Sequence, residues 1–547
     1  MKRFFIEQKG LILLWILCAI ALLIFCGHYN SILFDIGREV YYPERILDGR
    51  ILYKDLFNIY GPFPYLFNAL LYKIFSIRLN TLYFSGALCS FAIVSGIYLI
   101  SKKFLSEFLS ISLGIFTIAT GVCATHLFNY TLPYSYGMLY GTVALIYSLL
   151  AIIKYKQENR TEFLYLAALL GGICISSKYD FLIYGFILLA IALFTNNKRL
   201  ILNFITCFLF IPVICCVTLF IQGLGINDVI SAVTDIKHIM SSESLKFFYT
   251  NQGIYFSLKV IPVWIINIIK TSLIFGIIFG GIKLAEKHKI IGYGLAAFGA
   301  LVLFIIINPA IFVFIAPLTI ITAIVLYKQL KSNSVLIWMT LITLSACIKC
   351  FWIMIPLNYG NYILPLTLCT FFAIMFSAVD KKYQKAAAIG ILALSLNYAL
   401  LFYTQRDFLN NEIKTEKGTI YTMQGEAEGI NSLIAGLEQS NAKSAVIYPE
   451  GLVINFLTGI KSDDYYNSML PLYIESLGED RFINSIQTEK PEYIILNNKS
   501  TAEYGANMVG EDFALDFKNY VLENYELIED MDNNFRNLVF HIKNSKK

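Results

Sequence analysis

The chain opens with an apolar run at residues 10–27, GLILLWILCAIALLIFCG, which is soon followed by a polar stretch at residues 34–62, FDIGREVYYPERILDGRILYKDLFNIYGP. The apolar run is long enough to cross a bilayer, since a membrane helix takes about 20 mostly apolar residues. The polar stretch holds nine charged side chains, so it is expected to stay outside the hydrocarbon. A crossing followed by a charged connection is the pattern from which the rest of the chain is interpreted.

The composition of the whole chain extends this pattern. Of 547 residues, 57% are apolar and 15% are charged, whereas about 25% of residues are charged in soluble proteins. The mean hydropathy is +0.63. These values exclude a soluble enzyme, a disordered protein and a collagen-like fibre.

We therefore predict an α-helical polytopic membrane protein with about 11–13 transmembrane helices. The expected spans are 10–27, 81–101, 105–123, 136–153, 162–177, 180–195, 200–221, 260–282, 290–307, 310–327, 335–355, 362–379 and 385–402. The apolar stretch 162–195 is interrupted only at Ser176-Ser177-Lys178, so the count is open there by one or two.

Basic residues gather in every second connection between these spans, which is the positive-inside pattern. The clusters are Lys2/Arg3/Lys9, Lys102/Lys103, Lys154/Lys156/Arg160, Lys198/Arg199, Lys283/Lys287/Lys289, Lys328/Lys331 and Lys381/Lys382/Lys385. The pattern predicts a multi-pass protein of the cell (inner) membrane with a cytoplasmic N-terminus and an extracytoplasmic C-terminus. Two long connections, residues 28–80 (the first connection) and 222–259 (the second connection), then lie on the outer side.

Charge and cysteine content divide the chain into a membrane domain at 1–402 and a tail at 403–547. The tail holds 23 acidic and 13 basic residues, net −10, and the rest holds 15 acidic and 30 basic residues, net +15. The basic residues form short clusters rather than one continuous face, so nucleic acid is not an expected partner. All eleven cysteines precede the tail, which must therefore fold without disulfides.

The tail alternates helix and strand patterns, which predicts a small extracytoplasmic α/β domain. Helices are expected at 426–439, 472–488 and 511–527, and strands at 444–448, 492–496 and 537–542. No catalytic constellation is evident in its scattered acids.

The first connection carries the clearest chemical pattern. Asp35 and Glu39 are four residues apart, so their carboxylates share one face of a helical turn. Arg38 and Arg45 lie close by in the sequence. This set indicates either a solvated helix with salt bridges, or a site at which a carboxylate takes a proton from an acceptor while cations hold a departing phosphate.

The run Asp35…Glu39…Leu47-x-Gly49-x-x-x-Tyr53-x-Asp55-x-Phe57…Gly61-Pro62 resembles the first outer loop of GT-C superfamily glycosyltransferases. It is most similar to the family 39-like clan that contains protein O-mannosyltransferases and the lipid A aminoarabinose transferase, in a bacterial polytopic form. The segment Tyr448-Pro449-Glu450-Gly451-x-x-x-Asn455-Phe456-x-Thr458-Gly459 is similar to one found in the tails of bacterial members. The order of spans, acidic motif and C-terminal domain is similar as well.

This resemblance implies a transferase that moves a sugar from a polyprenyl-phosphate donor to a lipid, glycan or protein acceptor, with inversion. Asp35 takes the position of the family's aspartate that acts as general base or positions the acceptor, and Glu39 stands four residues away where the mannosyltransferases have an adjacent second acid. Lys178, Arg38 and Arg45 are the candidate phosphate ligands, and Lys178 could instead only pair with Asp180 at the membrane surface. The candidate acceptor or sugar ligands are Tyr53, Asp55, His126, Asn129, Asn361 and Tyr362.

The sequence departs from the family pattern in two further places. The loop 124–133 has no acid, and Asn361-Tyr362 stands where an Arg-Tyr pair is common. No cofactor is expected, and a divalent metal has no evident site. Cys347 and Cys350 lie within a predicted span and are interpreted as packing residues.

Two other functions compete with the transferase. A transporter or flippase of lipid-linked saccharides usually buries charges in the middle of the bilayer, where Lys349 is the main exception in this chain. A scaffold that only displays the tail would not require so many spans.

Overall fold

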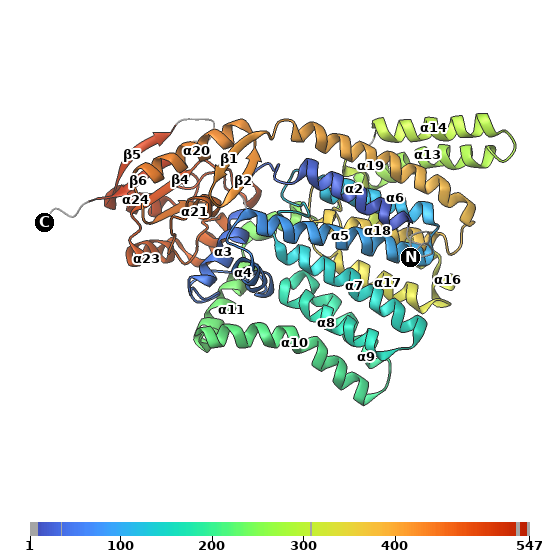
Figure 1. The fold of residues 1–547 in the computed structure, drawn as a ribbon, viewed down its shortest axis with the longest axis horizontal. Helices are drawn as coiled ribbons and strands as arrows, with labels where there is room; N and C mark the ends of the chain where they lie inside the picture. The colour runs from blue at the N-terminus through green and yellow to red at the C-terminus, as the bar shows by residue number, and fades with distance from the viewer. Residues whose placement is uncertain (1–8, 34, 307–308, 532–536, 544–547) are drawn as a thin grey trace.

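The computed structural model describes residues 9–33, 35–306, 309–531 and 537–543. It has two parts, a helical body and the tail, which lies at one end of that body (Figure 1). Six segments are long and apolar enough to cross a membrane: Leu79–Phe104 (α5), Tyr136–Glu158 (α7), Lys198–Gln222 (α10), Val260–Leu284 (α13), Lys289–Ile306 (α14) and Lys381–Arg406 (η4 and α19).

Seven shorter apolar segments complete the body: Lys9–Phe25 (α2), Glu107–Val122 (α6 and η1), Thr161–Ser177 (α8), Tyr179–Leu193 (η2 and α9), Phe312–Val325 (the end of η3, and α15), Ser334–Ala346 (α17) and Gly360–Met375 (α18). Each predicted span overlaps one of these thirteen segments. The chain is therefore an α-helical polytopic membrane protein.

Burial separates central from peripheral helices. In its most apolar window α7 is 83% buried inside the protein, whereas α10 and α13 are 17% buried. Apolar helices with so little protein contact must present their side chains to lipid. The turn between α13 and α14 and the short helix α16 (Tyr327–Lys331), both with clustered lysines, lie at the end of the body away from the tail (Figure 1).

The predicted span at 335–355 is wrong in its second half. The helix α17 ends at Ala346, and an irregular segment runs from residue 347 to residue 359 before α18 begins. Pro356 disfavours helical backbone at the residue before it, and the amide of Trp352 donates to the carbonyl of Gly253 at 3.2 Å. The segment is therefore tied to the end of the second connection.

The connections between spans also have defined structure. The first connection contains α3 (Ile36–Leu47) and α4 (Phe63–Ile74), and the second contains α11 (Ile226–Met240) and α12 (Glu243–Asn251). Loop 124–135 packs closely on α5, where a side chain at Gly86 would come within 2.1 Å of the carbonyl oxygen of Thr131.

The tail is an α/β domain, as predicted. Its four-stranded sheet has the order β3-β4-β6-β5, with β3 parallel to β4 and the other pairs antiparallel. The strands are Ala445–Tyr448, Tyr493–Asn497, Asn537–Ile542 and Tyr525–Met531 in that order. Buried side chains such as Val446, Ile494 and Phe540 form the core of the sheet.

The tail differs from the prediction in four places. The expected helix 472–488 divides into α22 (Pro471–Leu477) and α23 (Glu479–Glu489), because Gly478 has φ +81°. The expected helix 511–527 is shorter at both ends, as α24 (Leu515–Asn524), and the chain continues as β5. The hairpin β1–β2 (Asn411–Thr415, Gly418–Thr422) and the helix α21 (Leu452–Thr458) were not predicted, whereas α20 (Gln424–Gln439) was.

The tail is docked on the first connection. The helix α3 crosses α21 so closely that a Cβ atom at Gly37 would lie 2.5 Å from the backbone nitrogen of Val453 and 2.7 Å from the Cβ of Leu452. Backbone hydrogen bonds join Tyr421 of β2 to Gly27 (2.7 Å) and Tyr29 (2.9 Å). The position of the tail is therefore fixed by the segment that carries Asp35.

We predict that Gly37→Ala weakens this docking. The added methyl group meets backbone atoms, which cannot rotate away, so the variant should lose about 1–3 kcal/mol of stability. The thermal unfolding midpoint of the detergent-solubilised protein and the rate of proteolysis of the tail measure the effect. Gly276→Ala, where an added Cβ has no neighbour within 4 Å, is the matched control, and equal midpoints for the two variants would contradict the prediction.

Candidate functional site

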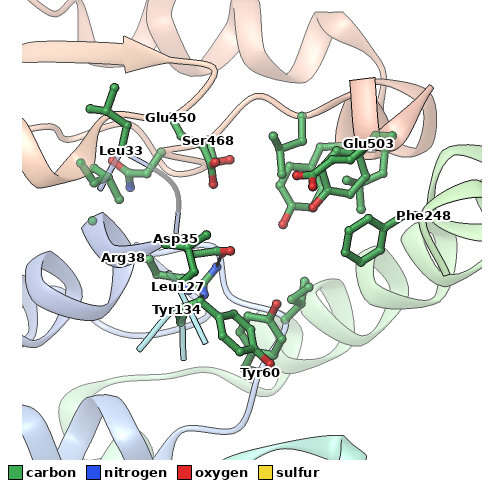
Figure 2. Close-up of a pocket in the computed structure, with 18 of the residues that line it drawn as sticks. Leu33, Asp35, Arg38, Tyr60, Leu127, Tyr134, Phe248, Glu450, Ser468 and Glu503 are labelled. Atoms are coloured by element: carbon green, nitrogen blue, oxygen red, sulfur yellow. Dashed lines mark hydrogen bonds and ion pairs between the residues drawn. The ribbon is translucent and has the colours of Figure 1, made fainter. Parts of the chain in front are cut away.

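A cavity of about 310 Å³ lies where the tail meets the helical body. Its walls come from the first connection, loop 124–135, α12, the segment 347–359 and the tail. Of the residues that the sequence singled out, Asp35, Arg38 and His126 line it. Figure 2 shows Asp35 and Arg38 entering from one side, opposite Glu503 and Phe248.

Asp35 stands at the N-terminus of α3 with φ +42° and ψ −37°. Positive φ is uncommon outside glycine, and aspartate is among the residues that tolerate it best. The carboxylate receives no capping hydrogen bond from α3 and is one-third exposed. It lies 3.0 Å from Nη1 of Arg38. A carboxylate placed in this way is accessible to a bound molecule.

Arg38 is held by several groups at once. Its Nε contacts the Glu39 carboxylate at 3.2 Å and donates to the Tyr65 hydroxyl at 3.0 Å, and its Nη2 donates to the Tyr134 carbonyl at 3.2 Å. The guanidinium also lies over the Tyr60 ring, 4.7 Å from its centroid. These contacts fix a cation in the cavity wall.

Glu39 is 1% exposed and does not line the cavity. Its carboxylate accepts from the backbone nitrogen of Tyr136 at 2.7 Å and from the Tyr65 hydroxyl at 3.1 Å. The pair Asp35 and Glu39 therefore divides into an accessible carboxylate and a buried one that anchors Arg38.

Lys349 supplies a second cation to the cavity wall. Its Nζ lies 3.7 Å from Oδ1 of Asp180 and 4.6 Å from the centroid of the Tyr359 ring. Lys178 is completely buried, donates to the Tyr134 hydroxyl at 2.7 Å and lies 4.0 Å from Oδ2 of Asp180. Two lysines therefore share one buried carboxylate, and only Lys349 reaches the cavity.

Loop 124–135 brings together the remaining polar candidates. Asn129 is completely buried, and its Oδ1 accepts from the backbone nitrogens of Thr131 (2.8 Å) and Leu132 (2.7 Å). Asn361 donates to the Phe128 carbonyl, and Tyr362 donates to the Asn129 carbonyl at 3.2 Å. The Asn129 side chain stabilises its own loop, and the Asn361 and Tyr362 side chains hold that loop on α18. None of the three lines the cavity, whereas His126 does.

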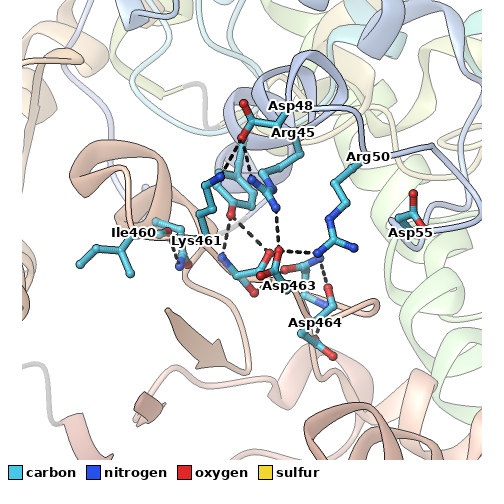
Figure 3. A network of polar contacts seen from close by, with 12 residues as sticks. Arg45, Asp48, Arg50, Asp55, Ile460, Lys461, Asp463 and Asp464 are labelled. Atoms are coloured by element: carbon cyan, nitrogen blue, oxygen red, sulfur yellow. Dashed lines mark hydrogen bonds and ion pairs between the residues drawn. The ribbon is translucent and has the colours of Figure 1, made fainter. Parts of the chain in front are cut away.

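Three candidates of the first connection lie outside the cavity lining. Arg45 pairs with Asp48 at 2.7 Å and with Asp463 of the tail at 2.6 Å, as Figure 3 shows. Tyr53 donates to the Tyr60 carbonyl at 2.5 Å, and Asp55 accepts from the backbone nitrogen of Ile51 at 2.8 Å. Arg45 therefore links α3 to the tail. Tyr53 and Asp55 stabilise the turn to which they belong.

The contributions of Lys349 and of the tail to the cavity were not predicted from the sequence. A lysine inside an apolar run was a usable signal, but the helix was expected to continue through it. Glu450 belongs to the tail segment that resembles family members, and it pairs with Lys499 beside the cavity. Nothing in the local sequence marks Glu503.

Metal ligands do not cluster in the part of the chain that the structure describes, where no group of three or more His, Cys, Asp or Glu side chains is placed to hold an ion. Cys347 and Cys350 are buried next to apolar neighbours.

Comparison with known proteins gave matches among solved structures alone. No protein-family model and no curated protein matches the sequence. The chain is similar to ArnT from Cupriavidus metallidurans in the apo state (10% identity, TM-score 0.46, 98% of each chain) and bound to undecaprenyl phosphate (10%, 0.46, 97% and 98%). It is also similar to the Archaeoglobus fulgidus oligosaccharyltransferase tethered with an acceptor peptide (12%, 0.48, 100% of this chain and 75% of that one).

The buried imidazole of His126 generates a pH prediction. Burial disfavours the charged ring and lowers the pKa of His126 from 6.5 to about 4. The unfolded chain therefore binds the proton first, and stability that is present above pH 6.5 is lost as the pH falls toward 4. At pH 4.5 this loss should reach roughly 2–3 kcal/mol.

Unfolding midpoints at pH 7 and pH 4.5 test this predicted loss of stability on acidification. His126→Asn keeps an oxygen that can accept from the Phe128 amide, which donates to Nδ1 at 3.1 Å in the native loop. The variant should lose less stability on acidification than the wild type. Equal losses would show that His126 does not take up the proton.

Proposed function

We propose that the protein is a membrane glycosyltransferase that moves a sugar from a polyprenyl-phosphate-linked donor to a lipid, glycan or protein acceptor, with inversion. One observation carries the proposal. The accessible carboxylate of Asp35 shares a cavity with two fixed cations, Arg38 and Lys349, at the junction of a membrane body and the tail. This is the set of groups that such a transfer requires.

The chemistry assigns the carboxylate to the acceptor. Asp35 takes the proton from the acceptor's hydroxyl or amine as that group attacks the anomeric carbon. The bond from the anomeric carbon to the phosphate oxygen breaks, its electron pair leaves with the polyprenyl phosphate, and attack from the opposite face inverts the configuration. The ion pair with Arg38, at 3.0 Å, holds the Asp35 carboxylate in place.

The cations stabilise the departing phosphate. Charge grows on the phosphate oxygen as the glycosidic bond breaks, and preorganised donors in a site of restricted water access stabilise it most effectively. Lys178 and Lys349 share a single carboxylate, Asp180. Of the two lysines, Lys349 faces the cavity and is placed to contact a phosphate. Lys178 does not contact the phosphate itself, and it positions Asp180 and Tyr134 through its own contacts with them.

The orientation follows from the same arrangement. We propose that the tail is extracytoplasmic, because the lysine clusters on the α13–α14 turn and on α16 lie at the opposite end of the body (Figure 1) and clustered lysines favour the cytoplasmic side. The N-terminus is then cytoplasmic, in the cell (inner) membrane. A lipid-linked donor suits this topology, since its sugar can be presented on the outer face.

Replacement of Asp35 tests the proposed base. Asp35→Asn should lower kcat by about 10²–10⁴-fold, because the amide cannot accept the proton, while undecaprenyl phosphate still binds. The assay measures release of undecaprenyl phosphate from a panel of its monoglycosyl derivatives, in proteoliposomes supplied with cell-envelope extract. Asp516→Asn, an exposed position on α24, is the control. Unchanged turnover in Asp35→Asn would remove the proposed role, and sugar movement across the membrane without transfer would indicate a flippase.

Replacement of Lys349 tests the phosphate contact. Lys349→Met should weaken undecaprenyl phosphate binding by roughly 10- to 100-fold, since a hydrogen bond to a charged group contributes about 1.5–3 kcal/mol. Lys246→Met removes a charge from an exposed position on α12 and should have little effect. Equal affinities of the two variants for the lipid, measured in detergent micelles, would contradict the assignment.

A further inference from the structure

Across the cavity from Asp35, α12 and the tail form a rim of distinct composition. Phe248 and Gln252, four residues apart, lie on one face at the end of α12. Glu503 and Tyr504 belong to η5 (Ala502–Tyr504) of the tail. All four residues line the cavity. Figure 2 shows Glu503 and Phe248 next to each other on the side opposite Asp35 and Arg38.

Contacts between the second connection and the tail hold this rim in place. The Phe248 and Tyr504 rings stack with centroids 4.8 Å apart at an angle of 19°. The Glu475 carboxylate of the tail accepts from the backbone nitrogens of Glu243 (2.8 Å) and Ser244 (3.0 Å), at the N-terminus of α12. The rim therefore has a defined shape without any ligand.

Two polar groups of the rim are available to a ligand. Oε1 of Gln252 is buried and has no hydrogen-bond partner among the described residues. The Glu503 carboxylate is exposed toward the cavity and makes no hydrogen bond or close ion pair among the same residues, although the charge of Lys499 attracts it. The other two carboxylates of the lining are paired, Asp35 with Arg38 and Glu450 with Lys499. A buried amide oxygen without a partner, such as that of Gln252, is rare and calls for an explanation, whereas the exposed Glu503 carboxylate is open to water and to a ligand.

The unpaired groups accept hydrogen bonds, and they stand beside aromatic faces. Carboxylate and amide oxygens accept from hydroxyl groups, and the electron-rich face of an aromatic ring attracts weakly positive C–H groups. A sugar ring offers both kinds of group, hydroxyls at its edge and C–H bonds on its face. A phosphate or carboxylate would be repelled by Glu503.

We propose that Phe248, Gln252, Glu503 and Tyr504 form a subsite for a neutral sugar ring of the acceptor, so that the acceptor is a glycan rather than a peptide. This inference rests on the proposed function, because Asp35 is the group that the bound acceptor must reach. Arg38 and Lys349 are the proposed contacts of the donor phosphate, and the rim holds the acceptor across the cavity from Asp35 and Arg38. The tail thus acts in acceptor selection.

Saturation-transfer NMR on the full chain in nanodiscs tests the subsite, with chitotetraose, mannotetraose and maltotetraose as probes. At least one tetrasaccharide should receive saturation from the wild type. Glu503→Gln should weaken its binding about fivefold to tenfold, since the hydrogen bonds that it loses are to a charged acceptor. Gln252→Met should weaken it as well. Glu523→Gln, an exposed position on α24, is the matched control.

A second measurement separates this proposal from the proposed function. Undecaprenyl phosphate should bind Glu503→Gln as it binds the wild type, because the rim does not contact the phosphate. Loss of sugar binding in Glu503→Gln supports the subsite, whether or not undecaprenyl phosphate binds the wild type. Failure of undecaprenyl phosphate to bind the wild type would count against the proposed donor. The subsite is overturned if no tetrasaccharide binds the wild type, if both rim variants bind like the control, or if acceptor peptides compete at the rim.

Discussion

The docking of the tail on α3 is the constraint on which the candidate site depends. Gly37 lets α21 approach the helix whose first turn carries Asp35, and Asp463 pairs at 2.6 Å with both Arg45 and Arg50 behind it. Neither part of the molecule closes the cavity alone, since the body supplies Asp35 and the tail supplies Glu503. A buried arginine paired across two domains is costly to separate, so the two parts are expected to stay together.

The helical body and the tail contribute different charged groups to the site. In the helical body, Lys178 and Lys349 are almost completely buried, and Asp180 with a shell of tyrosine rings compensates them. The tail contributes carboxylates to the same cavity. An anionic group is therefore favoured against the body, and a group that donates hydrogen bonds is favoured against the tail. Under the proposed function, this polarity places the donor phosphate against the body and the acceptor against the tail.

Several residues with the chemistry of ligands form the scaffold instead. Asn129 satisfies the backbone of its own loop, Asn361 ties that loop to α18, and Glu39 anchors Arg38. Each of them would leave buried donors or acceptors unpaired if it turned toward a ligand, at a cost of about 1–3 kcal/mol per group. The residue types thus predict where polar side chains gather in the fold. Their hydrogen bonds in the folded protein determine which of these side chains are free to contact a ligand.

The sequence by itself determined the membrane body, the α/β tail and the place of Asp35 and Arg38, because apolar run length, alternation of helix and strand patterns and spacing along one helix are local properties. It could not place Lys349, since α17 ends at Ala346 and the segment that follows is tied through Trp352 to Gly253, about 100 residues earlier in the chain. Nor could it join Glu503 to Asp35, which are far apart in the chain. Only tertiary packing decides which distant side chains share a cavity, because burial and pairing are set by neighbours that the local sequence does not contain.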